Sequence, residues 1–581
     1  MKKVDIYMMA VLLLLLAAVS AGAQNIDPTV VVNRDYEGKL MEVHKPKLEM
    51  AIPDSVLRFD LEFDYSVSDS PYKGAYDFTP YVLDLKPSPA FRHIGKLYLS
   101  AGAGYQLHPE LDFVWTPALK SDAFRMNVYA HNRSYIGNWW NITESGNDGV
   151  PVLDRPGKDS QTRKWSGPDV SSKAGINGKY DWNSAALRFE AGYYGLYQQD
   201  MNATSRAYDA MNLNVGLSSK EKIGKGFGYS LDLAYCYAGE DMRKENSLKE
   251  NLLGVDARLH STFSDGHRIS LDMDYEMAGY EGYIASNASF LSLSPHYMKK
   301  FRNWDIDLGL VLSKVFRNPD GTHMFRHKIQ GLYPDVRIAF KAIPSMCLYA
   351  EAGGGARMNT YSALLASDRR INLNYGRGQE LLDMTDERVR AVLGVEGRIT
   401  SRFSYGLECG YSNYASSPLW AVVRQYDGVG QSLLPALTYD AWSKVFVSFD
   451  WKLMTERIDF DGVVEYVSPK NADQDSPAIL PASITGDVSL RYNWKKRVYA
   501  GVSCDFSSAR SSESGFRTGD EAFASVVIPG YADLGVELEC LINHKISLWA
   551  KGGNLLNMTI QRSLFYAESG PYFTLGFSLN L

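Results

Sequence analysis

One pattern recurs along most of this chain of 581 residues: two strands with alternating apolar and polar side chains, joined by a tight turn. In residues 253–259 and 269–277, every odd position is apolar, and the even positions hold glycine or polar and charged residues. Between them, Asp265 and Gly266 form a dipeptide typical of a two-residue hairpin turn. Successive side chains of a strand point to opposite faces. Each hairpin therefore has one apolar face and one face too polar to bury in a dry core.

Further hairpins surround short turns, whereas the connections between hairpins are long. The short turns read TSR, KKR and NHK, and the long connections expected from the pattern are residues 133–172, 359–386, 415–440 and 508–530. A soluble β-sandwich is the alternative, but it need not place short turns at one end and long loops at the other. Bacterial outer-membrane barrels do, with an apolar outer face and a polar lumen. The pattern predicts an all-β, transmembrane antiparallel barrel of roughly 14 to 22 strands, with 22 as the best count.

The last ten residues, YFTLGFSLNL, form a strand of the same kind. Its odd positions carry the large apolar side chains, which are Phe573, Leu575, Phe577, Leu579 and Leu581. A free apolar strand at a chain end would invite aggregation, and pairing with the first strand removes this edge. We therefore predict that this strand closes the barrel, presents its odd positions to outer-membrane lipid and serves as the assembly signal.

The start of the chain has the features of a secretory signal peptide, residues 1–23. Two lysines precede the apolar run Met8–Val19, and an Ala-x-Ala cleavage site ends at Ala23. An anchoring helix is the alternative, but the run is shorter than the roughly 20 residues that span a bilayer. Cleavage would leave an extended, proline-rich periplasmic or luminal segment, residues 24–95, ahead of the barrel, residues 96–581.

The sequence contains no recognisable catalytic, metal-binding or cofactor-binding motif, so we do not expect an enzyme. The net charge of −6 argues against a nucleic-acid partner. Acidic residues outnumber basic residues on the faces predicted to point inward. Such a lumen would favour cations or a basic partner segment, and a hydrated wall with local ion pairs is the alternative.

Three tryptophans in the first long connection are candidates for contact with a surface ligand or a protein partner. They are Trp139, Trp140 and Trp165. Exposed tryptophans can stack on sugars or anchor a partner. The alternative is that these residues belong to the aromatic girdles that barrels carry at both membrane interfaces.

Residues 551–581 read KGGNLLNMTIQRSLFYAESGPYFTLGFSLNL. The stretch Asn554–Asn557, followed by a loop and an alternating terminal strand, resembles the end of TonB-dependent receptors. The resemblance implies a barrel of about 22 strands. Two departures are Gly570-Pro571, where such receptors often carry Gly-Arg, and Leu581, where their last residue is usually Phe. Such receptors also thread a globular plug through the barrel, and we recognise no plug-like sequence in residues 24–95.

Near the start of the chain, PTVVVNRDYEG resembles the short hydrophobic box that contacts TonB in these receptors. The box-like residues are Thr29, Val30, Val31 and Val32. Over most of its length the chain is similar to a group of plugless, receptor-like outer-membrane proteins of Bacteroidota, whose function is poorly defined. The leader stretches that carry this resemblance are Arg34–Leu40, Lys45–Leu48 and Phe63–Pro87.

Two functions are open on the sequence. The first is uptake or passage of a solute across the cell outer membrane, with a TonB-type energising complex or a surface lipoprotein as the partner. The second is a non-transporting accessory or scaffold barrel in an outer-membrane assembly complex, with barrel-assembly subunits as partners. A lumen of this width would leak if it were open, because barrel diameter grows with strand number. We therefore expect residues 24–95, inward-folded loops or a partner to occlude it.

Overall fold

The computed structural model describes residues 97–581, apart from short gaps. The gaps are residues 118, 120–122, 146–149, 159, 161–162, 202–203, 221–225, 242–246, 264–265, 283–284, 318–323, 372–381, 427–430, 513–516 and 519–520. The expected signal peptide, the segment 24–95 and the box-like residues Thr29–Val32 lie outside the described residues.

The described chain forms a closed antiparallel barrel of 22 strands, which confirms the predicted fold and the best count. Each barrel strand pairs with the next one along the chain, and β28 (Tyr572–Asn580) pairs with β1 (Leu97–Tyr105), so the barrel sheet closes on itself. The other barrel strands are β2 (Glu110–Trp115), β3 (Phe124–Trp140), β6 (Lys164–Asp181), β7 (Ala185–Gln199), β8 (Ser205–Ser219), β9 (Gly226–Glu240), β10 (Lys249–Thr262), β11 (His267–Glu281), β12 (Ser286–Phe301), β13 (Trp304–Arg317), β14 (Leu332–Ile343), β15 (Met346–Met358), β16 (Met384–Thr400), β17 (Phe403–Tyr426), β18 (Gln431–Met454), β19 (Ile458–Asn471), β20 (Ile484–Trp494), β21 (Val498–Ser507), β26 (Tyr531–Leu541) and β27 (Ile546–Gly553).

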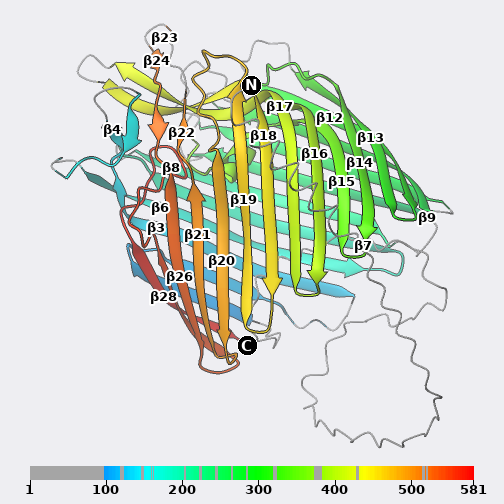
Figure 1. Cartoon of the computed structure of the whole chain (residues 1–581), viewed down its shortest axis with the longest axis horizontal. Coiled ribbons are helices and arrows are strands. Elements are labelled where there is room, and N and C mark those ends of the chain that lie inside the picture. Colours follow the sequence, from blue (N-terminus) through cyan, green and yellow to red (C-terminus); the bar gives the residue numbers. More distant parts are fainter. Residues whose placement is uncertain are drawn as a thin grey trace, which may run out of the picture. The chain divides into compact units, whose positions relative to one another are not determined.

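The two ends of the barrel differ in the length of their connections (Figure 1). At one end, which we call the turn end, connections are as short as residues 302–303 and 401–402, and the C-terminus lies there. At the other, the loop end, the connections hold short elements. These are β4 (Thr143–Ser145), β5 (Val152–Asp154), α2 (Tyr361–Ser367), β22 (Arg510–Ser511), β23 (Arg517–Thr518), β24 (Glu521–Phe523) and β25 (Val527–Ile528). In outer-membrane barrels the short turns face the periplasm and the long loops face outward.

Two of the connections expected to be loops are largely strand. The expected loop 133–172 shrinks to 141–163, because β3 and β6 stay paired up to Trp139 and Trp140. The expected loop 415–440 is a hairpin, because β17 and β18 remain paired as far as Tyr426. These extensions run past the membrane-spanning part of the barrel and pack against other loops, so their side chains do not follow the lipid-facing alternation.

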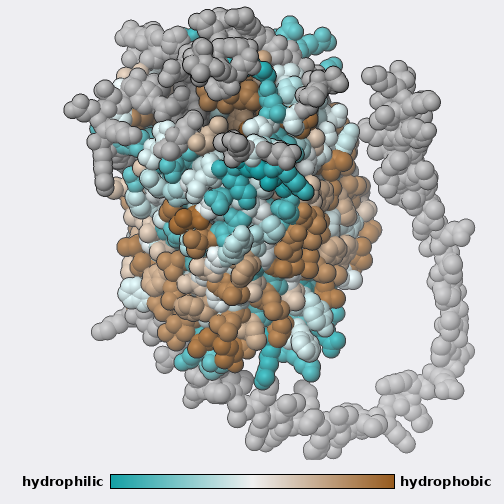
Figure 2. Space-filling view, turned by 90° about the vertical axis from the view of Figure 1, so that its left-hand side faces the viewer, coloured by the Kyte–Doolittle hydropathy of each residue, from teal (hydrophilic) through white to brown (hydrophobic). Residues whose placement is uncertain are grey.

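The outward side chains of the barrel are large, apolar and exposed, as lipid-facing residues must be. Brown, apolar residues cover much of the lower part of the face in Figure 2, and hydrophilic residues lie above them. Exposed aromatic side chains gather close to the turn end, where they form a girdle: Trp115, Trp182, Phe227, Phe263, Phe301, Trp304 and Trp494. The chain is thus an outer-membrane barrel. Among the described residues, no helix is long and apolar enough to cross a bilayer.

The seam between β1 and β28 follows the predicted orientation of the closing strand. Phe573, Leu575 and Phe577 are 51%, 56% and 43% exposed, whereas Thr574 between them is fully buried. Leu581 is also exposed, and it extends the seam through two backbone hydrogen bonds with Leu97. The N–H of Leu97 donates to the carbonyl oxygen of Leu581 at 3.0 Å, and the N–H of Leu581 donates to that of Leu97 at 2.9 Å. The alternation thus turns one face of β28 outward and the other into the barrel.

Gly104 lies in this seam, opposite Thr574, where the two backbones leave no room for a side chain. A Cβ at this position would lie 1.8 Å from the carbonyl oxygen of Phe573. We expect Gly104→Ala to force β1 away from β28 and to destabilise the closed barrel by about 1–3 kcal/mol. The measurement is the temperature at which the folded band disappears in unheated versus heated gel electrophoresis.

Gly353 in β15 is the matched control, because a Cβ there would meet no atom within 4 Å. Gly353→Ala should therefore leave the transition temperature close to that of the unchanged chain. Equal transition temperatures for the two variants would show that the seam tolerates the added methyl group.

Candidate functional site

A connection at the loop end folds back into the lumen instead of projecting outward. It follows β15, and its described inward part, residues 359–371, is called here the luminal segment. Its helix α2 starts after Thr360, whose Oγ1 accepts a hydrogen bond from the N–H of Ala363. The buried face of α2 packs against inward-facing residues of β7 to β12 and β18. This apolar cluster contains Tyr361, Leu364, Leu365, Leu196, Tyr208, Ala210, Ala238, Leu248, Ala278, Tyr280, Phe290 and Leu437.

A fully buried carboxylate on β10 anchors the start of α2. The two oxygens of Glu250 accept the backbone N–H groups of Tyr361, at 2.8 Å, and of Ser362, at 3.1 Å. These donors lie in the first turn of the helix, where no carbonyl of the helix itself can satisfy them. The hydroxyl of Tyr280 also donates to Glu250, at 2.7 Å, and the hydroxyl of Tyr361 donates to Glu240, at 2.8 Å.

The end of the luminal segment is held by Arg206, which projects inward from β8. Its guanidinium donates to the carbonyl oxygens of Ile371 and, at 2.7 Å, of Arg369. The same group donates to Gln198 at 2.6 Å. The barrel wall thus contacts both ends of the luminal segment through hydrogen bonds to its backbone.

Arg370 ties the luminal segment to β6, which is separated from β8 by a single strand of the wall. Its guanidinium is 5% exposed and pairs with Asp169 of β6, which is fully buried and also contacts Arg369 at 2.9 Å. The guanidinium carbon lies 4.5 Å from the ring centroid of Trp139 and 4.3 Å from that of Tyr566, within cation–π range of both. Burial lowers the pKa of Arg370, and the negative charge of Asp169 opposes that shift.

The three candidate tryptophans lie on strands, and two of them are buried. Trp139 and Trp140 are 2% and 6% exposed at the end of β3, so the expectation that they are exposed in a loop is wrong. Trp165 on β6 is partly exposed and stacks on Trp139 with a centroid distance of 5.6 Å. Pairing of β3 with β6 brings Trp139 and Trp165 together in register. A ligand-contact role stays a prediction, and Trp165 lines the pocket described below.

Loops and an overlong hairpin cover the mouth beside the luminal segment. The tip of the β17–β18 hairpin pairs with β24, and Figure 1 shows these elements together at the upper left. A second apolar cluster joins the connections around residues 141–163, 472–483, 508–530 and 554–571 to this hairpin. Its members include Trp140, Ile142, Leu153, Val422, Ile479, Ala524, Val526, Ile528, Leu564, Phe565 and Ala567. Segments of the chain itself therefore pack against one another at the loop end.

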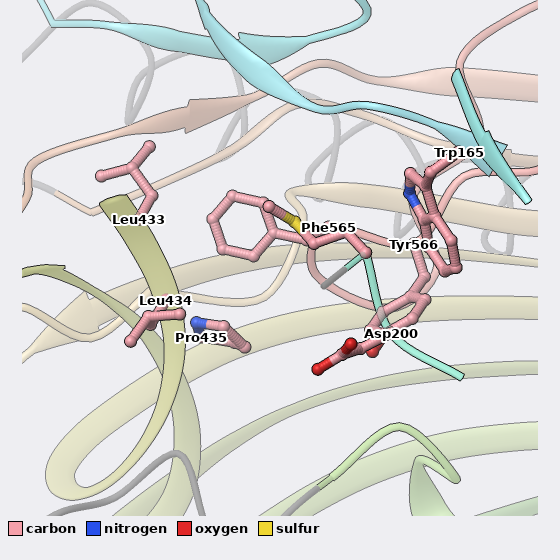
Figure 3. Close-up of a pocket in the computed structure, with 8 residues that line it drawn as sticks. Trp165, Asp200, Leu433, Leu434, Pro435, Phe565 and Tyr566 are labelled. Atoms are coloured by element: carbon pink, nitrogen blue, oxygen red, sulfur yellow. The ribbon is translucent and has the colours of Figure 1, made fainter. Parts of the chain in front are cut away.

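A small pocket opens between the hairpin tip and these loops (Figure 3). The volume within it that the centre of a water molecule can occupy is about 20 Å³, so the pocket has room for about one water. In Figure 3, Leu433, Leu434 and Pro435 from β18 lie on one side, and Trp165 and Tyr566 lie together on the other. The pocket is thus assembled from parts of the chain far apart in sequence.

Below the mouth, the inward faces carry rows of carboxylates in register on neighbouring strands. Asp232, Asp256 and Asp274 lie side by side on β9, β10 and β11. A second row, on β20, β21 and β26, consists of Asp487, Asp505 and Asp533. Like charges directly opposite one another destabilise a sheet, so such rows depend on water or cations. Arg562 supplies one cation to the second row, where it contacts Asp505 and Asp533, both at 2.7 Å.

Within the part of the chain that the structure describes, no group of three or more His, Cys, Asp or Glu side chains is placed to hold a metal ion. Of two histidines four positions apart in the sequence, His323 and His327, His323 lies outside the described residues, and the imidazole of His327 pairs with the carboxylate of Asp386 at 3.1 Å.

Comparisons with known proteins agree with this geometry. No protein-family model matches the chain, and no curated protein matches it. Solved structures do match it. A mutant of the ferric enterobactin receptor of Pseudomonas aeruginosa is 12% identical over 83% of this chain and 80% of its own, with a TM-score of 0.57.

Two further structures give the same result. The siderophore receptor PirA of Acinetobacter baumannii is 10% identical over 84% of this chain and 80% of its own, with a TM-score of 0.59. The FrpB iron transporter of Neisseria meningitidis is 9% identical over 83% and 81%, with a TM-score of 0.57. The chain shares their fold. At sequence identities this low, the likeness shows the fold of the barrel and does not indicate which ligand this chain binds.

Proposed function

We propose that this barrel takes up a solute across the outer membrane, and that the luminal segment is part of its gate. The fold supports this proposal, because the solved structures that share it are named as receptors and as a transporter. Residues 24–95 would add a second, periplasmic or luminal part of the gate. The barrel would then be a plugless member of the TonB-dependent receptor type, similar to the receptor-like proteins of Bacteroidota.

The observation that carries the proposal is the way in which the luminal segment is attached. Its polar anchors, Glu250, Arg206 and Asp169, are all side chains of the inner wall and each holds the segment by hydrogen bonds. Water can replace such contacts when a segment moves, whereas a covalent or continuous-sheet connection would fix it. A barrel that serves only as a scaffold has no need for a detachable segment in its lumen.

Solute flux into liposomes tests the proposal. We expect the purified full chain to pass sucrose slowly, and a variant with residues 361–371 replaced by a Gly-Ser linker to pass it at least about tenfold faster, because the luminal obstacle is gone. Replacement of the exposed residues 473–475, in the connection between β19 and β20, is the control and should leave the flux unchanged. Equal flux in the unchanged chain and the 361–371 variant would contradict the gate.

Purification from native membranes in mild detergent, with mass spectrometry of bound proteins, tests the partners. Recovery of a TonB-type energising complex or a surface lipoprotein is the expected result, and deletion of Thr29–Val32 should abolish recovery of the energising complex. Recovery of barrel-assembly subunits in their place would favour the accessory or scaffold role.

A further inference from the structure

We propose that three neighbouring turns at the turn end bind the headgroups of anionic phospholipids in the adjacent leaflet of the membrane. The turns are residues 455–457, 495–497 and 542–545, and they are called here the basic rim. The proposal goes beyond the proposed function, because it concerns the lipid around the barrel and not the solute that passes through it. It depends on the charge of these turns, on their place beside the lipid-facing surface and on their backbone conformation.

Hydrogen bonds join the three turns into one continuous surface. The N–H of Asn493 donates to the carbonyl oxygen of Arg457 at 2.7 Å, and the N–H of Leu541 donates to that of Arg497 at 2.8 Å. The side chain of Asn493 also donates to the carbonyl oxygen of Glu456, at 3.2 Å. Figure 1 shows the lower ends of β19, β20 and β21 next to one another, close to the C-terminus. The side chains of the three turns are therefore presented together.

The basic rim carries an excess of positive charge. Its exposed lysines and arginines are Arg457, Lys495, Lys496, Arg497 and Lys545. Glu456 is the acidic side chain on the same turns, and none of the five basic side chains forms an ion pair with a described carboxylate. By contrast, the turns 182–184 and 344–345 at the same end of the barrel carry no charged residue. The positive charge is thus concentrated on one part of the turn end, where it can attract an anionic partner.

The basic rim begins where the lipid-facing surface ends. The outward residues at these turns are large, apolar and exposed, and they are Ile458, Trp494, Ile542 and Ile546. Tryptophan is enriched at the level of the lipid headgroups. Consecutive strand residues are only about 3.3 Å apart, so the side chain of Lys495 reaches the layer that contains the phosphate groups. A soluble acidic partner would not need this apolar border, and the border therefore favours lipid as the occupant.

The central turn holds two lysines at positions that favour other residues. Lys495 and Lys496 have φ angles of +55° and +57°, in the left-handed region. The N–H of Arg497 donates to the carbonyl oxygen of Trp494 at 3.1 Å, so the two lysines are the central residues of a two-residue hairpin turn. Turns with a positive φ at both central residues prefer Asn-Gly or Asp-Gly. Strained residues cluster at ligand sites, and the property that these two exposed side chains supply is their charge.

Native mass spectrometry of the purified full chain in detergent tests the proposal, with phosphatidylglycerol as the anionic lipid and phosphatidylcholine as the zwitterionic lipid with the same acyl chains. At equal concentrations we expect the chain to retain at least about fivefold more phosphatidylglycerol, because only this lipid has a net negative charge. The double variant Lys495→Asn, Lys496→Gly removes two charges and supplies the dipeptide that the turn prefers. It should lower the retention of phosphatidylglycerol by about fivefold or more and leave the barrel folded.

The matched control is Lys158→Gln, Lys470→Gln, which removes two exposed lysines at the loop end and should retain phosphatidylglycerol as the unchanged chain does. An equal loss in this control would overturn the proposal, as would undiminished retention in Lys495→Asn, Lys496→Gly. Equal retention of the two lipids by the unchanged chain would also overturn it, and would leave an acidic protein segment as the partner of the basic rim. Unheated gel mobility establishes that each variant is a folded barrel.

Discussion

Replacement of Asp169 by alanine should release the luminal segment from the wall of the barrel. The change leaves Arg370 buried without its counter-charge, and loss of one partner from a buried ion pair typically costs about 3–5 kcal/mol. Because each 1.4 kcal/mol is about tenfold, the population of the released segment should rise by about a hundredfold or more. The measurement is hydrogen exchange of the backbone N–H groups in α2, supported by the conductance of single barrels in planar bilayers.

The Arg188–Asp232 pair offers a matched control on the inner wall. Its atoms are 3.2 Å apart, but its side chains are 57% and 43% exposed, and pairs of this kind contribute about 0–1 kcal/mol. Asp232→Ala should therefore leave exchange in α2 unchanged. The double variant Asp169→Leu, Arg370→Met removes both buried charges and should recover part of the lost protection. Equal exchange in Asp169→Ala and Asp232→Ala would show that Arg370 does not hold the segment.

The second large effect is expected on the closing strand. Phe577 is 43% exposed on the outer face of β28, opposite Ala101 of β1 and Leu548 of β27. Phe577→Arg places a charge in the hydrocarbon region, which costs about 2–4 kcal/mol near the bilayer midplane. The measurement is the free energy of unfolding in lipid vesicles, from a denaturant titration followed by tryptophan fluorescence.

Ser578 is the neighbouring control, because it faces inward, where its hydroxyl bonds that of Ser100 at 3.0 Å. An arginine at this position can extend its charge into the polar lumen, so Ser578→Arg should cost much less than Phe577→Arg. The same loss of stability at both positions would reject the lipid-facing assignment of the odd positions.

The alternation of side chains was enough to predict the barrel and the orientation of the closing strand, and it gave 22 as the best strand count within a range of 14 to 22. Every strand of the barrel contacts lipid on its outer face and water on its inner face. Each strand therefore shows the alternation of apolar and polar side chains within its own ten or so residues. The seam shows this directly, because Phe573, Leu575 and Phe577 lie outward, as their spacing predicts.

The luminal segment had a weaker sequence signal. Thr360 ahead of an apolar stretch is the signal of a helix start, and it could have suggested α2 inside the expected loop 359–386. A helix of seven residues has too few turns to show a periodic face, however, and it is stable here only because it packs against the barrel wall. The direction in which the segment folds cannot be inferred from such a short pattern.

The sequence by itself thus determined the barrel, because the alternation of apolar and polar side chains is a local pattern that is repeated in every strand. Only the tertiary structure decided how the mouth is closed. Asp169 and Arg370 are separated by 201 positions in the chain, and Trp165, Asp200, Leu433 and Tyr566 come from four connections or strands. Their contacts depend on which strand ends and loops the closed ring brings together, and no local periodicity records that proximity.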